Sequence, residues 1–84
     1  MEQFAILHET LQGQILITKD FDYAEGSFSV TLRFDIDEDL TCTPALKFKS
    51  ESVANNAFEN MKNVDNAKKI ANEALEGIFV PLFT

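Results

Sequence analysis

The chain has 84 residues and a mass of 9.4 kDa, and 45% of its residues are hydrophobic, including eight phenylalanines. This composition excludes a disordered chain, and the length leaves room for one small domain over residues 1–84. Fourteen Asp and Glu against seven Lys and Arg give a net charge of −7, which disfavours binding to nucleic acid or to an anionic membrane surface.

The cysteine content and the N-terminal residues indicate in which cellular compartment the protein is expected. Cys42 is the only cysteine, so the chain cannot form an intramolecular disulfide. Residues 1–3 lack the basic region of a signal peptide, and no segment approaches the roughly 20 apolar residues that span a bilayer. We therefore expect a cytoplasmic protein that does not bind membranes.

The first 36 residues predict three strands. Residues 4–8 are mostly apolar and predict the first, and Gly13 ends the connection that follows. Residues 15–23 and 27–36 predict the second and third, because apolar side chains recur at every second position. In the third strand these side chains are Phe28, Val30, Leu32, Phe34 and Ile36. Such alternation is typical of antiparallel strands with one buried face and one face in water.

A hairpin is expected to join the second and third strands. Its four-residue loop contains Gly26, which accepts a positive φ at little cost. Placing Tyr23 opposite Phe28 puts the apolar positions of both strands on one face. Lys19 is out of character on that face, and Leu16 falls unexplained on the wet face.

A fourth strand is predicted over residues 45–49, whose alternating lysines suit an exposed sheet edge. Before it, residues 37–44 predict a loop closed by proline. The strands and the helix described next predict an α+β fold of order β-β-β-β-α. This is an antiparallel meander of about four strands with a C-terminal helix packed on one face. The order of the strands in space is left open.

From Ser50 the apolar spacing changes to three and four residues, which predicts a helix with Ser50 as its N-cap. Gly77 suits a left-handed C-terminal cap. We favour one long or kinked helix over residues 51–76, against the alternative that Asp65 caps a second helix. The helix is rich in alanine and therefore suits close packing.

The apolar tail at residues 78–83 is expected to be covered, because such a segment is unfavourable in water. It either folds back over the sheet or packs against another chain. The candidate oligomer-interface residues are Ile78, Phe79, Val80, Leu82 and Phe83.

No residue set predicts catalysis, so we expect a non-enzymatic protein without cofactor or metal. His8 and Cys42 are the sole imidazole and thiol, and a Cys-His pair between them is a minor alternative. The acids of residues 35–39 are spaced like the start of a calcium loop, but Leu40 and Leu46 stand where that loop requires Gly and Glu. One Cys and one His do not make a zinc site, and the three glycines form no phosphate loop.

The remaining candidate is an acidic surface on the hairpin. Its residues are Asp20, Asp22, Glu25, Asp35, Asp37, Glu38 and Asp39. One interpretation is that these acids only keep the domain soluble. The function we favour is a protein-binding module, an inhibitor or adaptor, that engages a basic partner protein through this face. The alternatives are a structural homodimer and an inhibitor that mimics nucleic acid.

Overall fold

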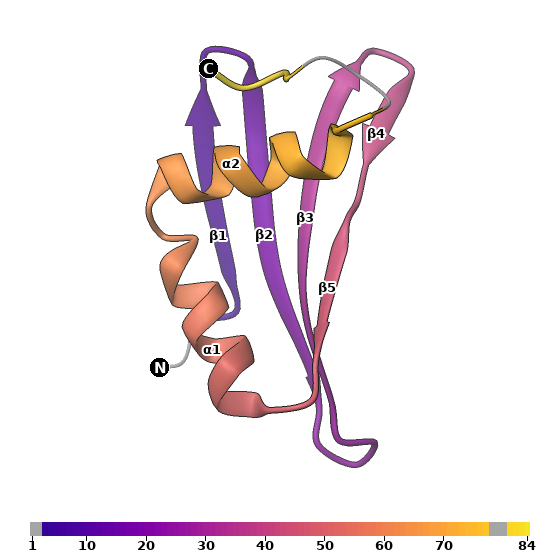
Figure 1. Cartoon of the computed structure of the whole chain (residues 1–84), viewed down its shortest axis with the longest axis vertical. Helices are drawn as coiled ribbons and strands as arrows, with labels where there is room; N and C mark the ends of the chain where they lie inside the picture. Colours follow the sequence, from indigo (N-terminus) through magenta and orange to yellow (C-terminus); the bar gives the residue numbers. More distant parts are fainter. Residues whose placement is uncertain (1–2, 78–80) are drawn as a thin grey trace.

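The structure is a computed structural model that describes residues 3–77 and 81–84. Its elements in chain order are β1 (Ala5–Thr10), β2 (Gly13–Asp22), β3 (Ser27–Asp37), β4 (Leu40–Cys42), β5 (Ala45–Phe48), α1 (Glu51–Asn60) and α2 (Val64–Leu75). Figure 1 shows both helices on one face of the sheet, with α2 running across the strands. The described residues thus form an α+β fold, as predicted.

The sheet is an antiparallel meander in which β1, β2 and β3 are neighbours in chain order. β4 and β5 both pair with β3, at residues 34–37 and 28–31, and together act as one interrupted edge strand. The loop predicted over residues 37–44 is therefore wrong in part, because it contains β4. Pro44 has no N–H for the ladder, but its carbonyl oxygen accepts from the N–H of Leu32 at 2.9 Å and keeps the chain beside β3.

The β2–β3 hairpin is present, but its register differs by two residues from the prediction. Phe21, and not Tyr23, is opposite Phe28. Asp22 favours this register, because its Oδ1 accepts from the backbone N–H of Glu25 at 3.1 Å and holds a turn over residues 23–26, one residue earlier than predicted, in which Tyr23 is 61% exposed. An even shift leaves every side chain on its predicted face, so the predicted alternation of burial is confirmed.

The core lies between the sheet and the helices. From the sheet it contains Ile15, Ile17, Val30, Leu32 and Phe34, each at most 2% exposed. From the helices it contains Ala54, Phe58, Ala67, Ala71 and Leu75, again at most 2% exposed. Ala67 and Ala71 of α2 are fully buried against the rest of the chain. This alanine-rich face is consequently used inside the chain.

Two helices are present where one long or kinked helix was favoured. Ser50 caps α1 as predicted, its side chain accepting from the N–H of Val53. The cap of α2 is Asn63 and not Asp65: Asn63 Oδ1 accepts from the N–H of Asp65 at 2.8 Å. An asparagine side chain that binds a nearby backbone N–H competes with the helical hydrogen bonds, which explains the break. Neither of the described helices is long and apolar enough to cross a membrane.

The C-terminal segment returns to the core in the part that the structure describes. Gly77 has a φ of +83°, as predicted for a left-handed cap. Phe83 is 4% exposed and packs edge-to-face on Phe34, with ring centroids 5.5 Å apart. Of the predicted oligomer-interface residues, Phe83 is thus buried in its own chain and Leu82 is half-buried. Ile78, Phe79 and Val80 lie outside the described residues.

Candidate functional site

The acidic candidates are all exposed to solvent. Asp20, Asp22 and Asp35 occupy the positions of β2 and β3 that alternate with the buried ones, so they project from the face opposite the helices. The rest, Glu25, Asp37, Glu38 and Asp39, lie at or beyond the strand ends. None of the seven carboxylates forms an ion pair with a lysine or arginine among the described residues.

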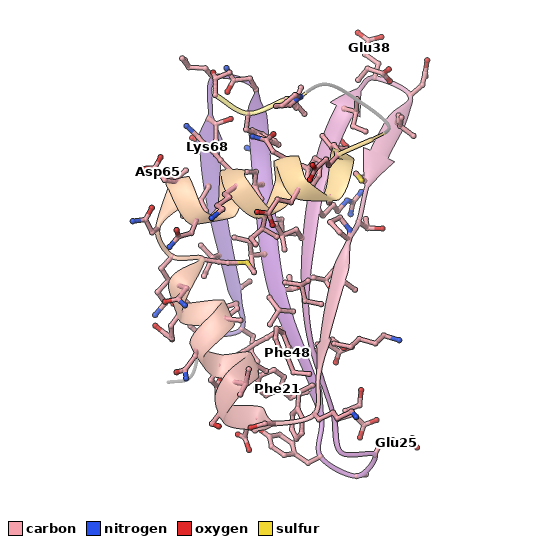
Figure 2. The ribbon with its side chains drawn as sticks, in the orientation of Figure 1. Phe21, Glu25, Glu38, Phe48, Asp65 and Lys68 are labelled. Carbon is pink, nitrogen blue, oxygen red and sulfur yellow. The ribbon has the colours of Figure 1, made fainter. Side chains whose placement is uncertain are left out.

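These acids form two groups and not one continuous surface. The tip acids are Asp20, Asp22 and Glu25, and the β3-end acids are Asp35, Asp37, Glu38 and Asp39. Figure 2 shows Glu25 and Glu38 at opposite ends of the long axis of the molecule, whose extent is 37 Å. Asp20 is opposite Ser29 of β3, and Ser29 lies about 20 Å from Asp35 along that strand, at roughly 3.3 Å per residue. The two groups of acids are therefore separated by about this distance. The single acidic hairpin face expected from the sequence is therefore divided, with Arg33 on the strand between the groups.

The β3-end acids include side chains that hold the turn and side chains that project from it. Asp37 Oδ1 accepts from the N–H of Asp39 at 2.8 Å, and Asp35 Oδ1 accepts from the Thr41 hydroxyl at 2.7 Å. A register irregularity lies between Asp35 and Asp37, where the strand turns toward β4. No hydrogen bond of the Glu38 or Asp39 carboxylates is present within the described part of the chain. These two charges are available to a partner without breaking an internal contact.

The tip acids lie beside cations and aromatic rings. Lys47 of β5 is opposite Ser29, which is itself opposite Asp20, so a positive charge shares the outer row of the sheet with that acid. Tyr23 donates a hydrogen bond to Glu51 Oε1 at 3.0 Å and stacks edge-to-face with Phe28 at 5.9 Å. The tip is thus less negative than the β3 end. Tyr23 was expected within a strand, and its exposure follows from its place in the turn over residues 23–26.

The minor alternative of a Cys-His pair is not formed. Cys42 was expected in the loop over residues 37–44, but it lies in β4, half-buried and opposite Phe34. His8 lies on β1, three strand spacings or about 14 Å away, with the buried Ile15 of β2 and Phe34 of β3 between the two. Instead, His8 Nε2 lies 2.6 Å from the carbonyl oxygen of Met61. A carbonyl only accepts, so Nε2 carries the proton in this contact.

The acids do not gather into a cation site. No group of three His, Cys, Asp or Glu side chains that could hold a metal ion is found in residues 3–77 and 81–84. The Asp35 and Asp37 side chains point their oxygens at local donors in the turn. Two of the acids that are spaced like the start of a calcium loop therefore stabilise the turn between β3 and β4.

Lys19, the exception to the alternation, is a buried cation that sequence reasoning left unexplained. It is 8% exposed, and its Nζ donates to Asn55 Oδ1 at 3.0 Å. The same Nζ lies 5.0 to 5.4 Å from the ring centroids of Phe4, Phe21 and Phe58. Cation–π contacts with the ring faces compensate for part of the lost hydration. The sequence signal was a lysine at a buried parity, close to Phe21 on the same strand.

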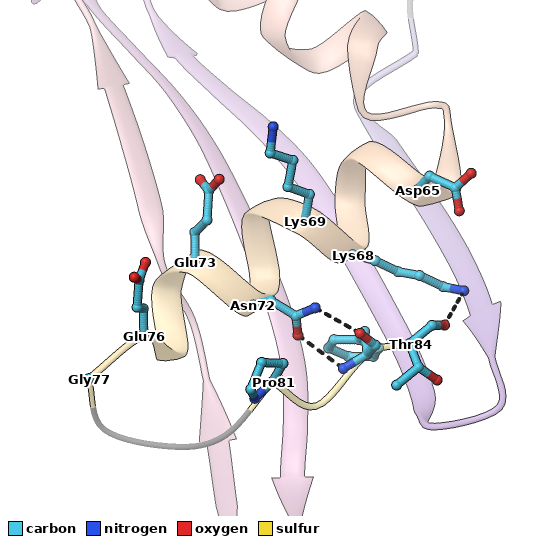
Figure 3. A pocket seen from close by; sticks show the side chains of 10 residues that line it. Asp65, Lys68, Lys69, Asn72, Glu73, Glu76, Gly77, Pro81 and Thr84 are labelled. Carbon is cyan, nitrogen blue, oxygen red and sulfur yellow. Dashed lines mark hydrogen bonds between the residues drawn. The ribbon is translucent and has the colours of Figure 1, made fainter.

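A groove of about 530 Å³ lies between α2 and residues 81–84 (Figure 3). Asn72 holds its outer wall: Oδ1 accepts from the N–H of Leu82 and of Phe83, both at 3.0 Å, and Nδ2 donates to the Phe83 carbonyl at 2.7 Å. The described lining carries charges of both signs, including Lys69 and Glu73, and contains neither histidine nor cysteine. We assign the groove no chemistry.

Comparisons with known proteins give no match, since no family model, no curated protein and no solved structure is significantly similar to this chain.

Proposed function

We propose that this chain is a non-enzymatic protein-binding module, an inhibitor or adaptor, that engages a basic partner protein through its exposed acids. The observation that carries the proposal is the set of β3-end acids: exposed carboxylates within five residues, free of ion pairs to the described lysines and arginines. A cluster of one sign speeds the encounter with an oppositely charged protein surface and selects against like-charged ones. The tip acids contribute less, because Lys47 lies in their row.

The test replaces carboxylates that form no hydrogen bond within the described part of the chain. A Glu38→Lys and Asp39→Lys double variant changes two projecting acids and leaves the hydrogen bonds of Asp35 and Asp37 intact. The matched control is Glu73→Lys and Glu76→Lys, which makes the same change in net charge at exposed positions of the α2 region. Each protein is immobilised and exposed to an extract of the native host, first at low ionic strength and then at about 0.5 M salt, where charges are screened within about 4 Å.

We expect the wild type and the control to retain the same basic protein at low salt and to release it at high salt. The β3-end variant should retain it at least about tenfold more weakly, since each lost charge pair contributes about 1 kcal/mol or more. Equal retention by both variants, or retention that does not respond to salt, would contradict the proposal. Displacement of the captured protein by duplex DNA would identify its groove as a nucleic-acid site and this chain as a nucleic-acid mimic.

The structural homodimer stays a second proposal with weaker support. Its two motives were the alanine-rich helix and the apolar tail, and residues of both are buried in the chain's own core: Ala67, Ala71 and Phe83 are at most 4% exposed, while Leu82 is half-buried. Light scattering on the full chain tests it directly, because a dimer doubles the mass.

A further inference from the structure

The two edges of the sheet differ in how they are protected against further pairing. On one side, the edge formed by β4 and β5 is interrupted at Pro44 and carries Lys47, both of which discourage the addition of another strand. On the other side, β1 contains no proline, no lysine and no bulge over Ala5–Thr10. Figure 1 shows β1 as the outermost strand of the sheet on that side.

The hydrogen bonds of β1 tell which backbone groups face outward. The N–H of Lys19 donates to the carbonyl of Phe4 at 3.0 Å, in the same register as the rest of the β1–β2 ladder. Backbone groups alternate in an antiparallel ladder, so even-numbered residues of β1 face β2 and odd-numbered residues face the free edge. The outward residues are Ala5, Leu7 and Glu9. The side-chain amide of Gln3 donates to the outward carbonyl of Ala5 at 2.9 Å, where the N–H of an added strand would lie.

Apolar side chains are exposed on both sides of this edge. Leu7, on the face away from the helices, is 54% exposed, and Phe4, on the side of the sheet that carries the helices, is 53% exposed. The junction of the two helices lies against the same strand, since His8 Nε2 contacts the Met61 carbonyl at 2.6 Å. A single extended segment added to β1 would lie beside Leu7 on one face of the sheet and beside Phe4 on the other. A second folded copy paired antiparallel with β1 would place its own helices on the face that carries this junction, whereas a single extended segment brings none.

We infer that the free edge of β1 accepts an extended segment of the basic partner as an added strand, an inference that rests on the proposed function. Main-chain hydrogen bonds to Ala5, Leu7 and Glu9 supply the pairing, and alternate side chains supply the selectivity. The segment carries an apolar residue opposite Leu7 and a Lys or Arg opposite Glu9, which is the one charged residue of β1. Opposite charges directly across an antiparallel pair stabilise it.

Amide hydrogen exchange measured residue by residue by NMR tests this inference on the full chain. The probe is a seven-residue peptide of alternating valine and threonine with a lysine at each end, added up to millimolar concentration. We expect the amides of Ala5, Leu7 and Glu9 to exchange at least about tenfold more slowly with the probe, while those of Ile6 and His8 are already protected by β2. A helix-face or end-on contact would not produce this alternation.

Two proline variants control the experiment. Leu7→Pro removes an outward N–H and no β1–β2 hydrogen bond, and proline is tolerated on such an edge. Leu11→Pro changes a leucine that is 99% exposed in the β1–β2 turn and leaves the edge amides in place. We expect Leu7→Pro to abolish protection and Leu11→Pro to retain it, with circular dichroism verifying that both variants fold.

The outcomes separate this inference from the proposed function. Absence of alternating protection in the wild type at the highest probe concentration overturns strand addition, and leaves salt-dependent capture by the β3-end acids to be judged on its own. Protection that rises with the concentration of this chain alone, without probe, overturns the choice of occupant and identifies a second copy.

Discussion

Polar side chains that reach into the interior do much to fix this small fold. Lys19, Asn72 and His8 each satisfy a group on another part of the chain: the Asn55 side chain, the backbone of residues 82–83, and the Met61 carbonyl. A buried polar group without a partner is costly, so such contacts select one arrangement of the chain among many. No buried side-chain nitrogen or oxygen without a hydrogen-bond partner is found among the described residues.

At Lys19 the packing of the side chain and its charge have separable effects. Lys19→Ala should lower the free energy of unfolding by about 2–4 kcal/mol, because it removes a buried stem and the cation–π contacts together. Lys19→Met keeps the volume and removes both the charge and its desolvation cost, so a loss below about 1 kcal/mol is expected. Urea denaturation monitored by circular dichroism measures both values. Equal losses in the two variants would show that the charge, and not the packing, matters.

Asn72 holds the C-terminal segment by side-chain contacts to three backbone groups. Asn72→Ala should cost about 2–3 kcal/mol, at about 1 kcal/mol per hydrogen bond. The control is Asn66→Ala, since the exposed Asn66 side chain donates a single hydrogen bond, to the Asn60 carbonyl. Chemical denaturation of both variants gives the comparison, and a cost at Asn72 no larger than at Asn66 would contradict this role.

At the scale of elements, the break between α1 and α2 changes what the helices can cover. A single helix over residues 51–76 would be about 39 Å long at roughly 1.5 Å per residue, longer than the 37 Å extent of the molecule. With the break, α2 runs across the strands (Figure 1), and Met61, 3% exposed, joins the core at the junction. The Met61 carbonyl, at the end of α1, then accepts from His8.

Substitutions at the N-terminus of α2 test which residue caps this helix. Asn63→Ala should lower the free energy of unfolding by about 1 kcal/mol, because the Asp65 N–H loses its acceptor. Asp65→Ala should cost less, about 0.3 kcal/mol, since its exposed charge acts only on the helix dipole. Thermal denaturation of the two variants ranks them. The opposite ranking would restore Asp65 as the cap.

For the whole molecule, charge opposes compactness. The net charge of −7 is spread over a chain of 84 residues, and two groups of acids lie at opposite ends of it. Self-repulsion of this kind destabilises the folded state and is screened by salt. The acid-rich composition therefore has a thermodynamic cost.

Raising sodium chloride from about 0.02 M to about 0.5 M should increase the melting temperature by a few degrees, roughly 4–8 °C if about 1 kcal/mol of repulsion is screened. The Glu73→Lys and Glu76→Lys variant carries less net negative charge and should respond less. Differential scanning calorimetry of both proteins measures the two slopes. A wild-type melting temperature that falls with salt would show that attractive charge pairs dominate.

By itself, the sequence determined the elements whose signal is local. Period-two alternation identified the buried faces of β2 and β3, and Ser50 and Gly77 marked the ends of the helical region, because side-chain parity and backbone capping depend on near neighbours. The exposure of Asp20, Asp22 and Asp35 followed from the same parity.

Only the tertiary structure decided the remaining features of the fold, because they depend on contacts between distant residues or on small free-energy differences between alternative local conformations. The Asp22 turn set the hairpin register, Asn63 prevailed over helix continuation, and the Pro44 carbonyl held the segment between β4 and β5 beside β3. The buried parity of Lys19 was visible in the sequence, but its placement among phenylalanines from β2, α1 and the N-terminal segment depends on contacts between distant residues. The division of the acids between two ends of the sheet likewise depends on strand length and pairing, which fix distances that residue spacing alone does not.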